Sequence, residues 1–182
     1  MKHDRPLPGD EVIPDPGLVM DRLLHLDAAP EVVWPWLVQL GKRRAGWYLP
    51  RAVEIVIPRA RRADWSIGSR WQQLAVGDEI PDWGPDDPTF RLIELDPGRH
   101  LVYWSQRPRS SRGGQARPPM RLTWALALEP TGTSASLLRL RLRLDLGTPP
   151  GPVATYGGGF LDWFTIELLG RGLNQRLHRS RR

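Results

Sequence analysis

The chain has 182 residues, a net charge of +6 and no cysteine. This length suits a single domain, and a chain without cysteine excludes disulfides, thiolate metal sites and a cysteine nucleophile. The four histidines lie too far apart for metal-ligand spacing, and the sequence has no phosphate loop or dinucleotide fingerprint, so we expect neither a metal nor another cofactor. No apolar run of about 18 residues occurs, and the first residues lack a signal-peptide pattern, so we expect a cytoplasmic protein.

The first half of the chain predicts an arm, a strand and two short helices. Residues 1–17 are rich in proline, glycine and aspartate, which is typical of an extended N-terminal arm. A single domain is expected over 18–179. It starts with a strand at 18–27, where apolar residues mostly alternate, and continues with short helices at 28–40 and 47–57.

The middle of the chain predicts a series of antiparallel strands. Alternating or apolar runs place them at 75–81, 89–95, 99–106, 120–129 and 134–146. The segment 107–119 is rich in arginine, glycine and serine and predicts a flexible basic loop. In the last strand, leucines alternate with Arg139, Arg141 and Arg143. Burying three unpaired guanidinium groups is prohibitive, so we expect the leucines to face the core and the arginines to face water.

A broad apolar stripe predicts a long helix over 153–179. Gly170 and Gly172 inside it each cost about 1 kcal/mol relative to alanine. Either they permit a close backbone approach, or they leave room for something else. The whole order predicts an α+β fold of the helix-grip type: a curved antiparallel sheet wrapped around the C-terminal helix, with two short helices after the first strand.

Several segments also resemble a known family. They are GDEVIP at 9–14, APEVVWPWLVQLG at 29–41, RAGWY at 44–48 and LAVGDEIP at 74–81. They resemble bacterial proteins of the SRPBCC superfamily, also called START-like, which includes polyketide cyclases/dehydrases and lipid-transport proteins. The resemblance covers essentially the whole chain. It implies a cavity between sheet and C-terminal helix that holds small hydrophobic molecules, but it implies no single activity.

Nine tryptophans are spread over most of the predicted elements. Each can simply fill the core, which is the interpretation we prefer for Trp36 and Trp124. Several around one cavity would suit a flat apolar ligand, because ligand pockets are mostly apolar with a few fixed polar groups. The residues that we expect to line such a cavity are Trp47, Tyr48, Trp71, Trp104, Trp163 and Phe164.

Three functions remain open. The first is a carrier or sensor that binds a small apolar molecule, as a monomer or a homodimer. The second is a cyclase- or dehydratase-like enzyme that uses Glu54 as acid or base together with Tyr48. The third is an interaction module that contacts anionic surfaces, such as lipid headgroups, through the basic segment 107–117 and the tail 176–182. Nucleic acid is not an expected partner, because the arginines are scattered and no binding motif accompanies them.

Overall fold

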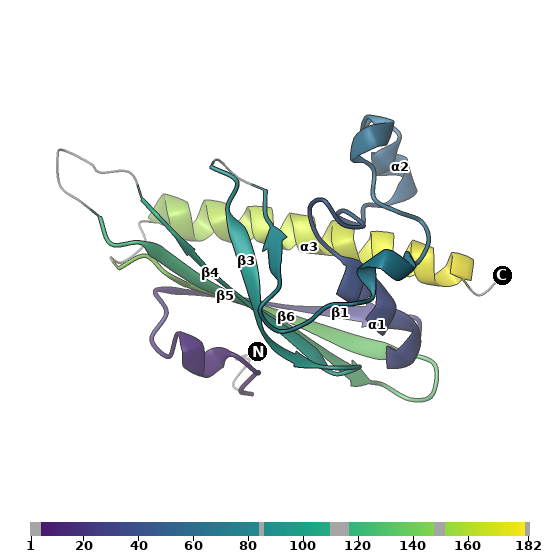
Figure 1. The fold of residues 1–182 in the computed structure, drawn as a ribbon, viewed down its shortest axis with the longest axis horizontal. Coiled ribbons are helices and arrows are strands. Elements are labelled where there is room, and N and C mark those ends of the chain that lie inside the picture. Colours follow the sequence, from purple (N-terminus) through teal and green to yellow (C-terminus); the bar gives the residue numbers. More distant parts are fainter. Residues whose placement is uncertain (1–4, 84–85, 110–116, 148–151, 181–182) are drawn as a thin grey trace.

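The computed structural model describes residues 5–83, 86–109, 117–147 and 152–180, with side chains of the last segment described from Phe164 onward. Six strands form one antiparallel sheet in the order β1-β6-β5-β4-β3-β2 (Figure 1). The strands are β1 (Leu18–Leu26), β2 (Glu79–Pro81), β3 (Thr89–Asp96), β4 (His100–Arg107), β5 (Met120–Pro130) and β6 (Ser136–Asp145).

Three α-helices accompany the sheet: α1 (Pro30–Gln39), α2 (Arg51–Glu54) and α3 (Pro152–Ser180). Single 3-10 turns lie at Asp10–Val12, Arg59–Arg61 and Ser69–Trp71. The helix α3 runs along one face of the curved sheet, while the N-terminal segment lies on the other face (Figure 1). The predicted α+β helix-grip fold is confirmed. In the described ranges no helix has both the length and the apolar character needed to cross a bilayer.

The second predicted helix is much shorter than expected, because only Arg51–Glu54 of the range 47–57 is helical. Pro50 explains its late start. A proline disfavours helical backbone in the residue before it, so the chain stays extended until Pro50 and the helix begins after it. This extended stretch is what lets the neighbouring side chains of Trp47 and Tyr48 point to different parts of the protein.

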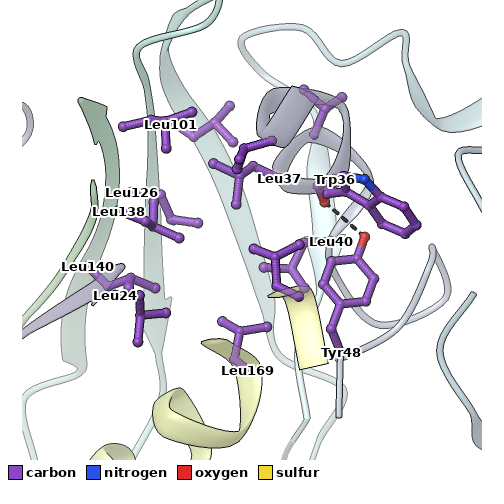
Figure 2. Close-up of a cluster of buried hydrophobic side chains, with 14 of the residues drawn as sticks. Leu24, Trp36, Leu37, Leu40, Tyr48, Leu101, Leu126, Leu138, Leu140 and Leu169 are labelled. Atoms are coloured by element: carbon purple, nitrogen blue, oxygen red, sulfur yellow. Dashed lines mark hydrogen bonds between the residues drawn. The ribbon is translucent and has the colours of Figure 1, made fainter. Parts of the chain in front are cut away.

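The core lies between α3 and the sheet, and aliphatic side chains fill it (Figure 2). Leu138 and Leu140 of β6 are buried, as the alternation predicts, and they lie opposite Leu169 of α3. Leu173 and Leu177, further along α3, are fully buried. Along the described part of α3, the space under the helix is therefore packed core and not an open cavity.

Gly172 permits a close approach between α3 and the chain before α2. A Cβ atom built on Gly172 would lie 2.5 Å from the carbonyl oxygen of Tyr48 and 2.6 Å from the carbonyl carbon of Leu49. A Cβ on Gly170 would instead meet a methyl group of Leu24 at 2.9 Å. Of the two explanations for these glycines, the close backbone approach applies to Gly172.

The expectation that the arginines of β6 face water is wrong for two of them. Arg139 and Arg141 are only 6% and 5% exposed, on the face of the sheet opposite the core. The N-terminal arm (residues 5–17) lies on this face of the sheet (Figure 1). The Arg141 guanidinium donates to the Asp21 carboxylate of β1 and to that of Asp10 in the arm, the latter at 2.6 Å. Burial works to lower the pKa of Arg141, but these two carboxylates more than offset it and hold the pKa above its ordinary value.

Candidate functional site

Five aromatic side chains converge on the core-facing side of β3, β4 and β5 and form a cleft, which we call the aromatic cleft. Aliphatic residues of the loop after α1 and of β2 close its other side. The aromatic members are Trp47, Trp83, Phe90, Tyr103 and Trp124, and further lining comes from Leu40, Gly41, Ile80, Pro81 and Asp82.

Trp124 lies at the centre of the aromatic cleft. Strand register pairs it with Tyr103 on β4, and the two rings stack with centroids 6.0 Å apart. Trp124 also stacks on Trp47, at 5.9 Å and an interplanar angle of 25°. Phe90 lies 6.1 Å from Trp124. Offset stacking of this kind favours flat aromatic groups over branched aliphatic ones.

The cleft is narrow in this state. Its volume is about 40 Å³, whereas an apolar cavity of about 150 Å³ is of the size that holds benzene. Trp83 forms the least constrained wall, because its side chain is 49% exposed and meets Trp47 edge-on at 5.9 Å. Trp47 is held more firmly, since its indole N–H donates to the Thr165 carbonyl of α3 at 3.4 Å. A ring-sized ligand would therefore have to displace Trp83 and not Trp47.

Charged groups lie at the mouth of the aromatic cleft. The Asp82 carboxylate accepts a hydrogen bond from Arg107 at 2.6 Å, and the Arg107 guanidinium lies over the Phe90 ring at 5.1 Å. The Lys42 ammonium donates to the Asp82 carbonyl and to the Asp87 carboxylate, both at 2.9 Å. The hydrogen bond from Lys42 holds the pKa of Asp87 below its usual range. The cleft thus offers apolar walls inside and a charged pair at its edge.

Tyr103 is the phenol within the cleft. Burial raises its pKa, although the charge of Arg44 acts in the opposite direction, so the hydroxyl stays protonated at neutral pH. A neutral phenol both donates and accepts hydrogen bonds. Tyr103 can therefore orient a polar substituent but cannot act as a base near pH 7.

Of the six predicted cavity walls, the structure places Trp47 in the cleft and Trp104 outside it. Trp104 follows Tyr103 on β4, and successive side chains on a strand point to opposite faces. It shares the outer face with Val102, which packs against Gly9 of the N-terminal arm. Tyr103 and Trp104 therefore point to opposite faces of the sheet, and of the two only Tyr103 lines the cleft.

The remaining predicted walls lie elsewhere. Trp71 has the guanidinium groups of Arg44 and Arg70 over its ring, at 5.1 and 4.7 Å, and is not part of the cleft lining. Phe164 is 47% exposed on α3. Trp163 belongs to the part of α3 whose side chains lie outside the described residues.

Glu54 and Tyr48 come together around a buried arginine and not around the cleft. Glu54 is 3% exposed and forms an ion pair with Arg176 at 2.6 Å; it also accepts the indole N–H of Trp65 at 2.7 Å. Tyr48 is fully buried, donates its hydroxyl to the Trp36 carbonyl (Figure 2), and has its pKa raised by burial. The Arg176 guanidinium lies over the Tyr48 ring at 4.8 Å, so both side chains pack around Arg176.

The expectation that the tail at 176–182 contacts anionic surfaces is wrong for its first residue, Arg176. It is fully buried and not on a solvated surface, and burial lowers its pKa despite the pairing with Glu54. Its guanidinium donates to the carbonyls of Asp64 at 2.8 Å and Leu49 at 3.0 Å, and lies over the Trp65 ring at 4.1 Å. Arg176 thereby ties the segment around α2 to α3. In the basic loop, residues 110–116 lie outside the described part of the chain.

The predicted cavity walls did not include Trp83, Phe90, Tyr103, Asp82 or Arg107, and a core role was preferred for Trp124. One signal was available, for Trp124. It alternates in phase with the leucines of its strand, which places it on the core-facing side. The sequence does not predict the register of β4 and β5 that places Tyr103 beside Trp124.

Two solved structures share this fold. A protein from Mesorhizobium loti is 18% identical, covers 90% of this chain and 98% of its own, and has a TM-score of 0.52. The protein XoxI from Bacillus cereus is 13% identical over 90% of this chain and 98% of its own, with a TM-score of 0.50. Both are bacterial proteins, and likeness at these identities supports the fold alone. No family model matches the sequence, and no curated protein is significantly similar to it.

Proposed function

We propose that the protein binds a small, flat, apolar molecule in the aromatic cleft, as a carrier or sensor. The observation that carries this proposal is the convergence of five aromatic rings on one cleft, with Trp124 stacked against two of them. We also propose that the chain belongs to the SRPBCC superfamily; its four resembling segments and its helix-grip fold support this placement.

The lining defines the chemical class of the ligand. Stacked indole and phenol faces favour an aromatic or conjugated ring system that slides beside Trp124. The Asp82–Arg107 pair at the mouth suits one polar substituent on the ligand, because a few fixed polar groups set orientation in a mostly apolar site. Since the cleft holds only about 40 Å³, the ring enters as Trp83 moves outward into solvent.

Binding of N-phenyl-1-naphthylamine, a neutral flat fluorophore, tests the proposal. The wild-type protein is expected to enhance the probe's fluorescence in a saturable way. Native mass spectrometry of the purified protein is expected to detect any apolar molecule that co-purifies. Trp124→Leu should weaken probe binding at least about tenfold, since it removes the ring on which the others stack, a loss of about 1.4 kcal/mol or more.

Trp104→Leu provides the matched control. It makes the same substitution on the neighbouring strand, but on the outer face of the sheet. Probe binding should be unchanged in this variant. Equal weakening by the two variants, or a wild-type protein that neither carries a ligand nor binds the probe, would overturn the proposal.

A further inference from the structure

The segment around α2 projects from the body of the protein (Figure 1). Its end carries exposed aliphatic side chains. We call residues 51–62 the α2 tip. Ile55 is 69% exposed and Val56 is 83% exposed, the two highest values among the large hydrophobic residues described as exposed. Both follow Glu54, whose buried pairing with Arg176 turns the helix so that these neighbours face outward. Together the two side chains form a small exposed apolar patch.

Arginines surround these aliphatic side chains. Arg51, Arg59, Arg61 and Arg62 are all exposed, and Glu54, which is buried and paired, is the only acidic residue of the α2 tip. The exposed charge of the tip is therefore entirely positive. Arg62 also donates to the carbonyls of Ile55 at 3.1 Å and Ile57 at 2.8 Å, which holds the end of the tip in shape.

A basic groove lies beside the α2 tip. It has a volume of about 750 Å³, is open to solvent, and is lined by Arg51, Trp65, Gln175, His178 and Arg179. Arg51 and Ile55 are four residues apart in helical backbone, so they share one side of the tip. The aliphatic end and the basic groove are thus continuous through Arg51.

We infer that the α2 tip docks on an anionic lipid bilayer, with Ile55 and Val56 entering the headgroup–acyl boundary and the arginines contacting lipid phosphates. Two projecting aliphatic side chains are far too few for the core of a protein interface, which buries about 800 Å² on each partner. A fluid bilayer needs only a shallow insertion combined with basic residues. Aliphatic side chains at the centre of a basic patch do not serve phosphate contacts with nucleic acid.

A single labelled cysteine tests insertion at the α2 tip. The natural chain has no cysteine, so Val56→Cys can carry an environment-sensitive nitrobenzoxadiazole dye at one position. Vesicles of phosphatidylcholine with about 30 mol% phosphatidylglycerol should brighten the dye and shift its emission to the blue. Val76→Cys is the matched control, because Val76 is 60% exposed and lies outside the tip; its dye should not respond.

Vesicle co-sedimentation separates the two contributions to binding. The double variant Ile55→Ser, Val56→Ser should bind these anionic vesicles roughly tenfold more weakly or worse, since it removes the inserted groups. Arg59→Ser with Arg61→Ser should weaken binding roughly 25-fold, at about fivefold for each arginine. Val76→Ser and Arg99→Ser, two exposed positions elsewhere, should bind as the wild type does. Pure phosphatidylcholine vesicles or about 0.5 M salt should abolish most binding.

Three outcomes would overturn this inference. The first is a wild-type protein that fails to sediment with anionic vesicles. The second is equal dye response at positions 56 and 76, or equal weakening by tip and control variants, since basic charge anywhere on the surface would then account for binding. The third is a dimer in sedimentation velocity that the double variant Ile55→Ser, Val56→Ser dissociates, because the tip would then contact a second copy of the chain.

Discussion

Replacing Gly172 with alanine would place a methyl group where the backbone of Tyr48 and Leu49 passes over α3. Its carbon would lie 2.5 Å from the Tyr48 carbonyl oxygen, about 0.9 Å short of the 3.4 Å at which ordinary contact begins. The obstructing atoms belong to backbone, and Arg176 holds that backbone through the Leu49 carbonyl. The clash cannot be relieved by turning a side chain.

Gly172→Ala has two opposing effects on the free energy of unfolding. Alanine in place of glycine stabilises a helix interior by about 1 kcal/mol. Overpacking that forces backbone shifts costs typically about 1–3 kcal/mol, and the rigid contact at Gly172 argues for the upper end. We therefore expect Gly172→Ala to lower the free energy of unfolding by about 2 kcal/mol. For a chain of this length that corresponds to a fall in Tm of about 4–8 °C.

Gly170→Ala supplies the comparison within the same helix. Its new methyl group meets only the end of the Leu24 side chain, at 2.9 Å, and this side chain can shift. The gain in helix propensity and the cost of contact should nearly cancel, giving a change close to zero. Urea unfolding followed by circular dichroism measures both variants. If Gly172→Ala were as stable as Gly170→Ala, the close backbone contact would have no energetic importance and the reasoning would fail.

Three further predictions concern charged pairs and the N-terminal arm. Glu54→Gln should lower the free energy of unfolding by about 3 kcal/mol in urea melts, because it leaves Arg176 buried without a countercharge; an unchanged urea midpoint would contradict this. Lys42→Gln should raise the pKa of Asp87 toward its ordinary value in an NMR titration of the carboxyl carbon. In the wild type the Lys42–Asp87 pair adds to the free energy of unfolding above the ordinary aspartate pKa. This contribution is lost as the pH falls through the lowered pKa of Asp87. In the variant, the free energy of unfolding should lack this contribution at neutral and at acid pH alike. A chain that begins after residue 13 loses two buried aliphatic side chains of the arm and should unfold at a lower urea midpoint, by about 3 kcal/mol, while its circular dichroism still shows the sheet.

The strands that alternate most strictly were the most predictable. The ranges 120–129 and 134–146 match β5 and β6 within two residues at either end, because one face of each strand packs on the core. The range 75–81 was wrong over most of its length, since only Glu79–Pro81 is strand. Gly77 adopts a positive φ of 101°, and the Asp78 side chain accepts the backbone N–H of Ala75, so a turn occupies this stretch.

The candidate site was less predictable than the fold. Whether Tyr103 or Trp104 faces the core depends on strand phase, which apolar neighbours on both sides leave ambiguous. The burial of Arg141 was unpredictable for a different reason. Its carboxylate partners, Asp10 and Asp21, lie more than a hundred residues away in sequence, and only the paired strands and the folded arm bring them together. The alternation of residues along one strand contains no information about contacts between residues so far apart in the sequence.

The position of β1 beside β6 has a consequence for how the chain folds. Leu26 pairs with Ser136 and Leu18 with Leu144, so in the described sheet the first strand pairs with the last one. Hairpins β3–β4, β4–β5 and β5–β6 can form from local contacts, but joining β1 closes a loop of more than a hundred residues, which is slow. During synthesis β1 stays without a partner until β6 has left the ribosome. A chain stopped before β6 would therefore present β1 as an open edge to any other strand.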